Sequence, residues 1–133
     1  MNVHYQPVAQ RANHRCEYCK APELVFNFPF EVEHIVPVCL NGSDELSNLA
    51  LACRSCNLRK GMRISFKDSQ TGEDVRFFHP RKDQWHVHFQ VNIDSAYVQG
   101  VTNIGKVTVD ALKMNAEAQV KARKLWVQLG LFP

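Results

Sequence analysis

The chain has no long apolar run. A membrane-spanning helix needs about 20 consecutive apolar residues, and no segment of the 133 residues approaches that length. Residues 1–15 also lack the apolar stretch that is typical of a secretory signal peptide. We therefore expect a cytoplasmic protein that has no membrane partner.

Acidic residues are missing from one part of the chain. The overall balance of 16 Lys and Arg against 13 Asp and Glu gives a formal charge of +3, which by itself does not indicate a nucleic-acid partner. Residues 46–67, however, contain no Asp or Glu. Their basic side chains, which could face the phosphates of a nucleic acid, are Arg54, Arg59, Lys60, Arg63 and Lys67.

Internal repeats and low-complexity runs are absent, and the second half of the chain contains no cysteine. A composition of 45% hydrophobic and 22% charged residues is that of one ordinary soluble domain. Four of the five cysteines form two CxxC pairs, Cys16/Cys19 and Cys53/Cys56. Because the cytosol keeps thiols reduced, paired CxxC motifs indicate a metal site.

Two CxxC turns supply four thiolates, which is the ligand set of structural zinc. Such a closed site leaves no position for a substrate, so its role is to hold the fold. The alternatives are four packed thiols or a redox pair, but a redox motif needs one pair in a βαβ context that the sequence lacks. Cys39 has no partner cysteine and is predicted to be an inert, packed residue.

The first half of the chain predicts the order strand, loop, strand, helix. Residues 30–36 alternate between apolar and polar side chains as a short strand does, and residues 41–48 are rich in turn formers. Residues 49–53 form a second apolar strand. Ser55 is predicted to N-cap a helix that runs to residue 64.

The second half has a different pattern. Residues 67–74 are polar with a central glycine, which favours a turn or hairpin tip. Residues 85–91 alternate strictly and predict a half-buried strand. A short helix is expected over residues 108–113, followed by a second helix that Asn115 caps and that reaches Leu129.

The second of these helices is expected to pack through one stripe and to expose its basic residues to solvent. The stripe consists of Ala118, Ala122, Leu125, Trp126 and Leu129. The basic face consists of Lys121, Arg123 and Lys124. His86 and His88 share a face of the predicted strand, but with no third ligand in sight we interpret them as surface residues rather than a metal pair.

A second polar group lies between the two CxxC pairs and on the helix that follows them. Glu33 and His34 stand on the first strand and Asn57 on the helix. Carboxylate and amide oxygens suit a hard divalent cation, and a neutral histidine beside it can take a proton from water. Glu31 lies on the same strand face as Glu33 and is either an auxiliary acid or an exposed strand residue.

The segments RCEYC, FEVEHIVP, NGSDELSNLALACRSCN and LRKG resemble the HNH nuclease family, in its zinc-bearing branch with the ββα-metal fold. The similarity covers residues 15–61. It implies that His34 is the general base and that Asn48 ties the loop to the metal-bearing hairpin. Asn57 stands where the family has its final His or Asn ligand, and Glu33 where an acidic ligand, more often Asp, precedes the base.

The resemblance implies metal-dependent hydrolysis of DNA phosphodiester bonds, with 5′-phosphate and 3′-hydroxyl products. Asn in place of His at position 57 favours Mg²⁺ or Mn²⁺ over a softer ion. Three basic residues on or after the helix, Arg59, Lys60 and Arg63, are predicted to hold the DNA backbone.

We therefore predict a small α+β protein. Residues 1–66 form a zinc-stapled ββα-metal nuclease core, and residues 67–133 form a strand and two helices that pack on it as part of one structural domain. Monomer and homodimer both remain open. The main alternative is a zinc-ribbon module that binds nucleic acid without catalysis, because only the nuclease needs Glu33, His34 and Asn57 together. A redox or zinc-storage protein ranks last, since it gives those three residues no role.

Overall fold

The computed structural model describes residues 2–133. The chain divides into two compact units, Met1–Arg63 and Ile64–Pro133, which we call unit 1 and unit 2. This division falls just before the predicted boundary at residues 66 and 67. The packing of the second half on the first stays a prediction. No helix in residues 2–133 is long and apolar enough to cross a membrane.

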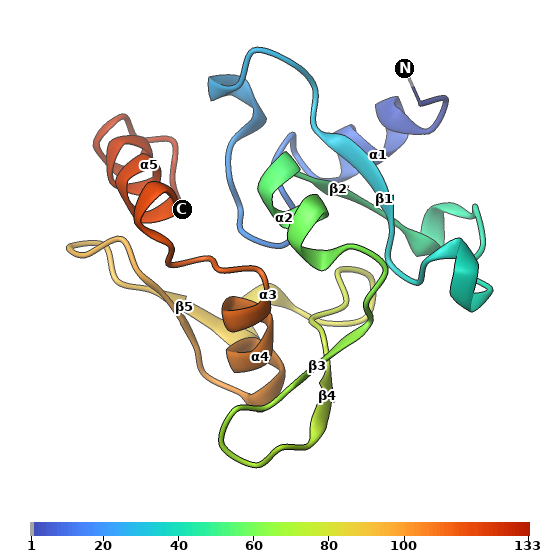
Figure 1. Cartoon of the computed structure of the whole chain (residues 1–133). Coiled ribbons are helices and arrows are strands. Elements are labelled where there is room, and N and C mark those ends of the chain that lie inside the picture. The colour runs from blue at the N-terminus through green and yellow to red at the C-terminus, as the bar shows by residue number, and fades with distance from the viewer. Residues whose placement is uncertain (1) are drawn as a thin grey trace. The chain divides into compact units, whose positions relative to one another are not determined.

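Unit 1 is built around a small antiparallel sheet of two strands followed by a helix (Figure 1). Strand β1 (Glu31–His34) pairs with β2 (Leu49–Ala52), with Glu31 opposite Ala52 and His34 opposite Leu49. All four residues of β2 are buried, because β1, α1 and α2 all pack against this strand. The order strand, loop, strand, helix was predicted correctly, and it is the ββα arrangement.

The other elements of unit 1 surround this sheet. Helix α1 precedes it and packs against β2 through its buried face, Val8 and Ala9. Short 3-10 helices lie before and between the strands. The bounds are α1 (Tyr5–Arg11), α2 (Arg54–Lys60) and the 3-10 helices Glu23–Val25, Val38–Leu40 and Leu46–Asn48.

Helix α2 starts and ends differently from the sequence prediction. Cys53 is its N-cap and is in extended conformation, and its sulfur accepts a hydrogen bond from the backbone nitrogen of Cys56 at 3.4 Å. The prediction that Ser55 caps this helix is therefore wrong, because the thiol of Cys53 takes the place of a capping oxygen. The helix ends at Lys60, since Gly61 follows with a positive φ of 55°.

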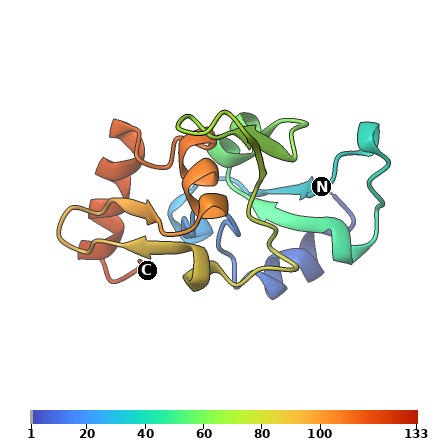
Figure 2. The same cartoon turned by 90° about the horizontal axis from the view of Figure 1, so that it is seen from below.

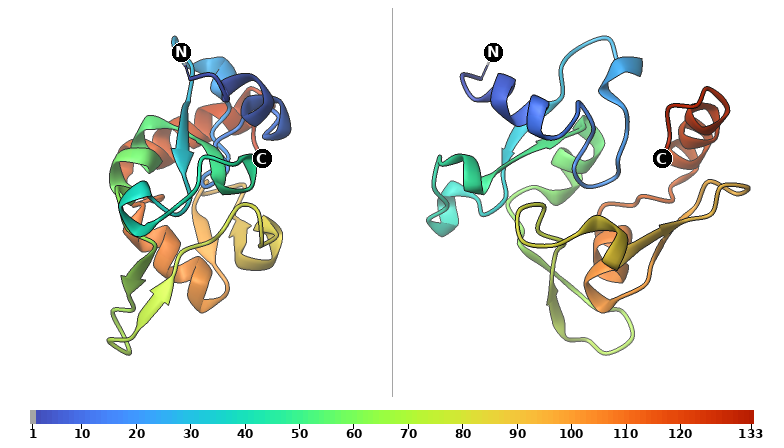
Figure 3. Two further views of the ribbon diagram at one scale, coloured as in Figure 1. Left: turned by 90° about the vertical axis from the view of Figure 1, so that its right-hand side faces the viewer. Right: turned by 180° about the vertical axis from the view of Figure 1, so that it is seen from behind.

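Unit 2 contains two hairpins and three helices. The predicted turn over residues 67–74 is confirmed, because it joins β3 to β4 in an antiparallel pair, an extended two-stranded arm (Figure 3, left). Helix α4 packs against this arm. The second hairpin, β5 with β6, lies beside α5 (Figure 2). The bounds are β3 (Ser65–Lys67), β4 (Asp74–Arg76), α3 (Trp85–His88), β5 (Phe89–Val91), β6 (Val98–Gly100), α4 (Asn103–Ala111) and α5 (Glu117–Gln128).

The strand predicted over residues 85–91 is wrong in its first part, which forms the single turn α3. Trp85 and Phe89 are four positions apart, and their ring centroids lie 4.8 Å from each other. Residues at this spacing meet on a helical turn and are far apart on a strand. His88, at the end of the turn, is held by a 2.6 Å hydrogen bond between its Nδ1 and Thr102 Oγ1. The contact of Trp85 with Phe89 and the hydrogen bond of His88 with Thr102 outweigh the alternating pattern of the sequence.

The C-terminal helices begin at other residues than predicted. Thr102 caps α4 by accepting a hydrogen bond from the Gly105 nitrogen at 3.0 Å, so this helix starts well before Thr108. Asn115 does not cap α5. Its amide instead pairs with the backbone of Val98, accepting from the nitrogen at 2.9 Å and donating to the oxygen at 2.7 Å.

The buried face of α5 is also rotated from the predicted stripe. Of the stripe residues Trp126 is buried, whereas Leu125 is 59% exposed. Arg123, predicted to be solvated, is fully buried and donates to the carbonyls of Ala96 and Met114 at 2.8 and 2.7 Å. A guanidinium that donates hydrogen bonds to two carbonyls can be buried despite its charge.

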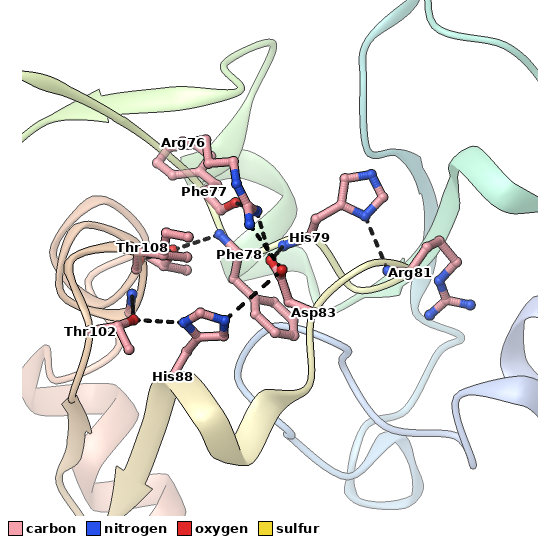
Figure 4. A network of polar contacts seen from close by, with 11 residues as sticks. Arg76, Phe77, Phe78, His79, Arg81, Asp83, His88, Thr102 and Thr108 are labelled. Atoms are coloured by element: carbon pink, nitrogen blue, oxygen red, sulfur yellow. Dashed lines mark hydrogen bonds and ion pairs between the residues drawn. The ribbon is translucent and has the colours of Figure 1, made fainter.

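A polar network joins β4 to α3 and α4 in unit 2 (Figure 4). The Asp83 carboxylate accepts two hydrogen bonds from the Arg76 guanidinium, at 2.7 and 2.9 Å, and one from the backbone nitrogen of His79 at 2.8 Å. His88 Nε2 lies 4.0 Å from the same carboxylate. The bidentate contact with Arg76 is the main reason why the pKa of Asp83 falls from 3.8 to about 2.

Candidate active site

The four cysteines of the two CxxC pairs meet in unit 1. All four side chains are buried, and the sulfurs of Cys16, Cys19, Cys53 and Cys56 lie within 4.8 Å of one another. The Cys19 and Cys53 sulfurs are 3.7 Å apart. Four thiolates at about 2.3 Å from one tetrahedral ion would be separated by about 3.8 Å. The cluster is therefore positioned to bind a metal ion, as predicted.

The surroundings of the cluster act differently on its sulfurs, because hydrogen bonds with Cys16 and the neighbouring cysteines raise the pKa of Cys19 and Cys56 well above its usual range, whereas Cys16 favours the deprotonated form. In each CxxC turn a backbone nitrogen donates to the first sulfur, Cys19 N to Cys16 Sγ at 3.5 Å and Cys56 N to Cys53 Sγ at 3.4 Å. Burial raises the pKa of the Cys16 thiol. Hydrogen bonds from the other three cysteines and from the Cys19 nitrogen lower it by more than burial raises it, so the net pKa lies well below its usual range. Thiolate is the form that binds metal.

Asn48 holds the loop between β1 and β2. Its side-chain oxygen accepts from the Val36 nitrogen at 2.9 Å, and its amide nitrogen donates to the carbonyls of Val36 and Ser43 at 2.9 and 2.8 Å. The loop passes so close that a Cβ at Gly42 would lie 1.7 Å from the Val36 oxygen. Asn48 and Gly42 together set the path of the chain immediately after His34.

His34 stands at the end of β1 with an acidic partner from this loop. Its Nε2 lies 2.7 Å from an Asp44 carboxylate oxygen. In the neutral imidazole that donates from Nε2 to Asp44, Nδ1 carries the free lone pair. Asp44 was not predicted as a site residue, and its place in a turn-rich loop gave no signal that it would meet His34.

Asn57 on α2 lines the same pocket as His34. The pocket has a volume of about 320 Å³, and Glu33 and Met62 also line it. The Asn57 amide nitrogen donates to the Glu31 carboxylate, and Glu31 also accepts from Arg54 at 3.1 Å. With its nitrogen held in this way, Asn57 keeps its side-chain oxygen for another partner.

The Glu33 carboxylate is bonded to two buried side chains, Tyr18 and Lys60. One carboxylate oxygen accepts from the Tyr18 hydroxyl, and the other lies 3.1 Å from Lys60 Nζ. Burial raises the pKa of Glu33, although the Lys60 charge and the Tyr18 hydrogen bond partly offset this. The structure thus places Glu31, and not Glu33, against the amide of Asn57.

The prediction that Lys60 contacts DNA is wrong. Its side chain is 1% exposed. Besides Glu33, its ammonium donates to the carbonyls of His34 and Ile35 at 3.2 and 2.9 Å. An ammonium group has three donors, and all three are engaged, so none remains for a phosphate.

The other two predicted DNA contacts lie at the end of α2. Arg63 is exposed and donates to the backbone oxygens of Arg59 and Lys60. Arg59 is half-buried.

Cys39, predicted to be packed, is exposed, and its sulfur lies 3.7 Å from that of Met62 at the pocket beside His34. The 3-10 turn that carries Cys39 buries none of its residues, which is why the thiol stays at the surface.

A comparison with protein-family models identifies this part of the chain. Residues 16–63 match the model of the HNH endonuclease family. The match covers 48 of the 133 residues, and we call this segment the HNH domain after the family that it matches. It contains both CxxC pairs, the ββα arrangement, and the pocket with His34 and Asn57. A search of curated proteins found no match, and a search of solved structures found none either. The HNH domain indicates a nuclease-family, nucleic-acid-directed role.

Proposed function

We propose that the protein is a metal-dependent endonuclease that hydrolyses phosphodiester bonds in DNA. One observation carries this proposal. His34 from β1 and Asn57 from α2 line a single pocket of the HNH domain, and Asp44 lies against the imidazole. A proton acceptor and an oxygen ligand for a cation are the two groups that hydrolysis of a phosphodiester needs side by side.

His34 is the general base of this proposal. Its Nδ1 takes a proton from a water molecule that attacks phosphorus in line with the leaving oxygen. The proton then resides on the imidazole, and the negative charge of Asp44, 2.7 Å from Nε2, stabilises the cation that forms. Asp44 also fixes which nitrogen faces the water.

The residues around Asn57 fit a hard divalent ion such as Mg²⁺ or Mn²⁺. The donor set consists of the Asn57 oxygen and of carboxylates, and the nearest carboxylate is that of Glu31. Glu33, the ligand expected from the sequence, would join by exchanging its contact with Tyr18 or Lys60. A bound ion would neutralise charge on the phosphate and on the leaving oxygen.

The remaining parts of the proposal concern zinc and the DNA backbone. The four-cysteine cluster takes zinc in a structural role, because its ligand set is closed to substrate. Arg59 and Arg63 are retained as phosphate contacts at the end of α2, where they position DNA without reading its sequence.

The test is cleavage of supercoiled plasmid by the purified full chain with Mg²⁺, Mn²⁺ or EDTA. We expect metal-dependent nicking or linearisation by the wild type and a loss of at least about 100-fold in His34→Ala, because a general base contributes about that much or more. His86→Ala is a matched control, since His86 is an exposed histidine in unit 2.

Cutting by His34→Ala at the wild-type rate would contradict the proposal. Retained DNA binding with no cutting by the folded, zinc-loaded wild type under any metal would favour the alternative, a zinc module that binds nucleic acid. The ratio of nicked to linear product addresses whether one strand or both are cut.

A further inference from the structure

A second pocket in unit 1 takes no part in the proposed reaction. Its volume is about 600 Å³, and Tyr5, His14, Glu23, Phe26 and Phe28 are among the residues that line it. We call it the aromatic pocket. It lies between α1 and the segment that leads into β1, outside the pocket of His34 and Asn57.

The polar side of this pocket is built around one carboxylate. Glu23 accepts hydrogen bonds from the Tyr5 hydroxyl at 2.9 Å and from the Phe30 backbone nitrogen at 2.6 Å, and it lies 2.7 Å from His14 Nδ1. Burial raises the pKa of Glu23, but these hydrogen bonds lower it more, so the net pKa is below its usual value. Glu23 is therefore ionised at neutral pH, and the pocket disfavours an anionic occupant such as a phosphate.

His14 offers a hydrogen-bonding edge to an occupant. With Nδ1 engaged by Glu23, its Nε2 remains, and the side chain is 53% exposed. Asn27, on the same wall, adds an exposed amide that can both donate and accept. The pocket thus combines two polar edges with no net positive charge.

The apolar side consists of exposed aromatic rings. Phe28 is 51% exposed. Phe26 is partly exposed as well, and its ring is fixed edge-on against the buried ring of Phe30, with 4.8 Å between centroids. Exposed phenyl faces cost free energy in water, and they are surfaces on which a flat ring stacks.

Separate pockets with shared lining residues follow one another from the aromatic pocket to His34. A neighbouring pocket of about 470 Å³ shares Tyr5 and Pro29 with it and continues along Glu31 and Val32. Val32 also lines the pocket of His34. At about 3.3 Å per residue, the chain from Pro29 to His34 spans about 17 Å. A strand of nucleic acid that follows this edge would reach both pockets.

We propose that the aromatic pocket binds an unstacked nucleobase of the DNA substrate, a few nucleotides from the bond that is cut. This inference rests on the proposed nuclease function. A nucleobase is flat, neutral and aromatic, with polar atoms along its edge, and it matches the stacking faces and the polar edges of the pocket, whereas the Glu23 carboxylate disfavours a phosphate there. Aromatic side chains bind bases of unpaired strands in this way.

The test measures binding of DNA to the zinc-loaded His34→Ala protein by fluorescence anisotropy. The probes are a duplex with one bulged nucleotide, the same duplex with an abasic site in the bulge, and the fully paired duplex. We expect the bulged base to bind about tenfold more tightly than the abasic bulge, and Phe28→Leu to abolish this difference. Phe28→Tyr should keep it, because it retains an aromatic ring.

Leu24→Ala is the matched control, since Leu24 lines the same pocket but offers no aromatic face. Metal-dependent plasmid cutting by the wild type, together with equal binding of the bulged and abasic duplexes by His34→Ala, would overturn this inference alone. Loss of all metal-dependent cutting by the wild type would instead count against the nuclease on which it rests. An unchanged difference between the two bulges when Phe28→Leu is added to His34→Ala would also overturn the inference.

Discussion

At the scale of single residues, Glu31 and Glu33 have different tasks although they are close neighbours on β1. Glu31 contacts the amide of Asn57, whereas Glu33 is paired with Lys60 inside unit 1. A carboxylate that holds an amide nitrogen orients the amide oxygen of the same side chain. Groups that orient a metal ligand in this way typically change metal affinity by 10 to 100-fold.

We therefore predict that Glu31→Ala raises the Mg²⁺ concentration for half-maximal cleavage by about tenfold and leaves the melting temperature nearly unchanged. The measurement is the initial rate of plasmid cleavage as a function of Mg²⁺. Arg54→Ala is the control, because it removes the other partner of Glu31 and leaves Asn57 in contact. An unaltered Mg²⁺ requirement in Glu31→Ala would show that Glu31 has no part in ion binding.

The sequence predicted the residues whose role depends on local spacing and missed those whose partners are distant. The two CxxC pairs and the strand order follow from short patterns. Lys60 and Arg123 look like ordinary surface cations, because nothing nearby in the sequence shows the carbonyls that bury them. Asp44 is one of several polar residues in its loop, and its meeting with His34 depends on how Asn48 folds that loop.

At the scale of elements, the cysteine cluster joins segments that are weak by themselves. The N-terminal CxxC turn has little regular structure, and β1, β2 and α2 are each short. Isolated helices and hairpins of this length are marginal in water. Metal bound by both turns would tie the N-terminal segment to the β2–α2 junction, so we expect metal binding and folding of unit 1 to be coupled.

Replacing Cys16 with Ser is expected to remove bound zinc and to unfold unit 1. The measurements are zinc content per chain and thermal unfolding followed by far-ultraviolet circular dichroism. Cys39→Ser serves as the control, because Cys39 is an exposed cysteine outside the cluster, and it should keep both zinc and melting temperature. A Cys16→Ser protein that melts like the wild type would refute the structural role.

Element boundaries in unit 2 were harder to predict than those in unit 1, for physical reasons. The alternation over residues 85–91 fits a strand, but the stacking of Trp85 on Phe89 and the anchoring of His88 by Thr102 select a helical turn. Asn115 has a typical capping side chain, yet it satisfies the backbone of Val98 instead. In each case a tertiary contact outweighs a local preference.

At the scale of the whole molecule, the two units depend on different chemistry. Unit 1 contains the cysteine cluster, whereas unit 2 contains the network around Asp83 and both tryptophans of the chain, Trp85 and Trp126. Tryptophan fluorescence therefore reports on unit 2. A metal chelator should destabilise unit 1, whereas acid should destabilise unit 2 by weakening the Asp83 network.

Acid is expected to destabilise unit 2 through Asp83. The usual pKa of an aspartate side chain is 3.8, and the pKa of Asp83 falls to about 2 in the folded unit. The ionised carboxylate thus stabilises the fold above about pH 4, and this contribution is lost as the pH falls towards 2. Because Arg76 is about half exposed, we expect a loss of about 1–2 kcal/mol.

The measurement is urea unfolding of the full chain, followed by tryptophan fluorescence between pH 5 and pH 2. Asp83→Asn should be less stable at pH 5 and should lose correspondingly less on acidification. Asp94→Asn is the control, because Asp94 is an exposed acid of unit 2. The same pH dependence in Asp83→Asn and wild type would exclude Asp83 as the source.

The threefold bonding of Lys60 has one more consequence. Its ammonium joins the last residue of α2 to Glu33 and to the carbonyls of His34 and Ile35. These contacts link the helix that carries Asn57 to the strand that carries His34. In the proposed nuclease, His34 and Asn57 would therefore already stand in one pocket before DNA binds. Discrimination among substrates would then depend on the placement of the scissile phosphate and not on the assembly of the catalytic groups.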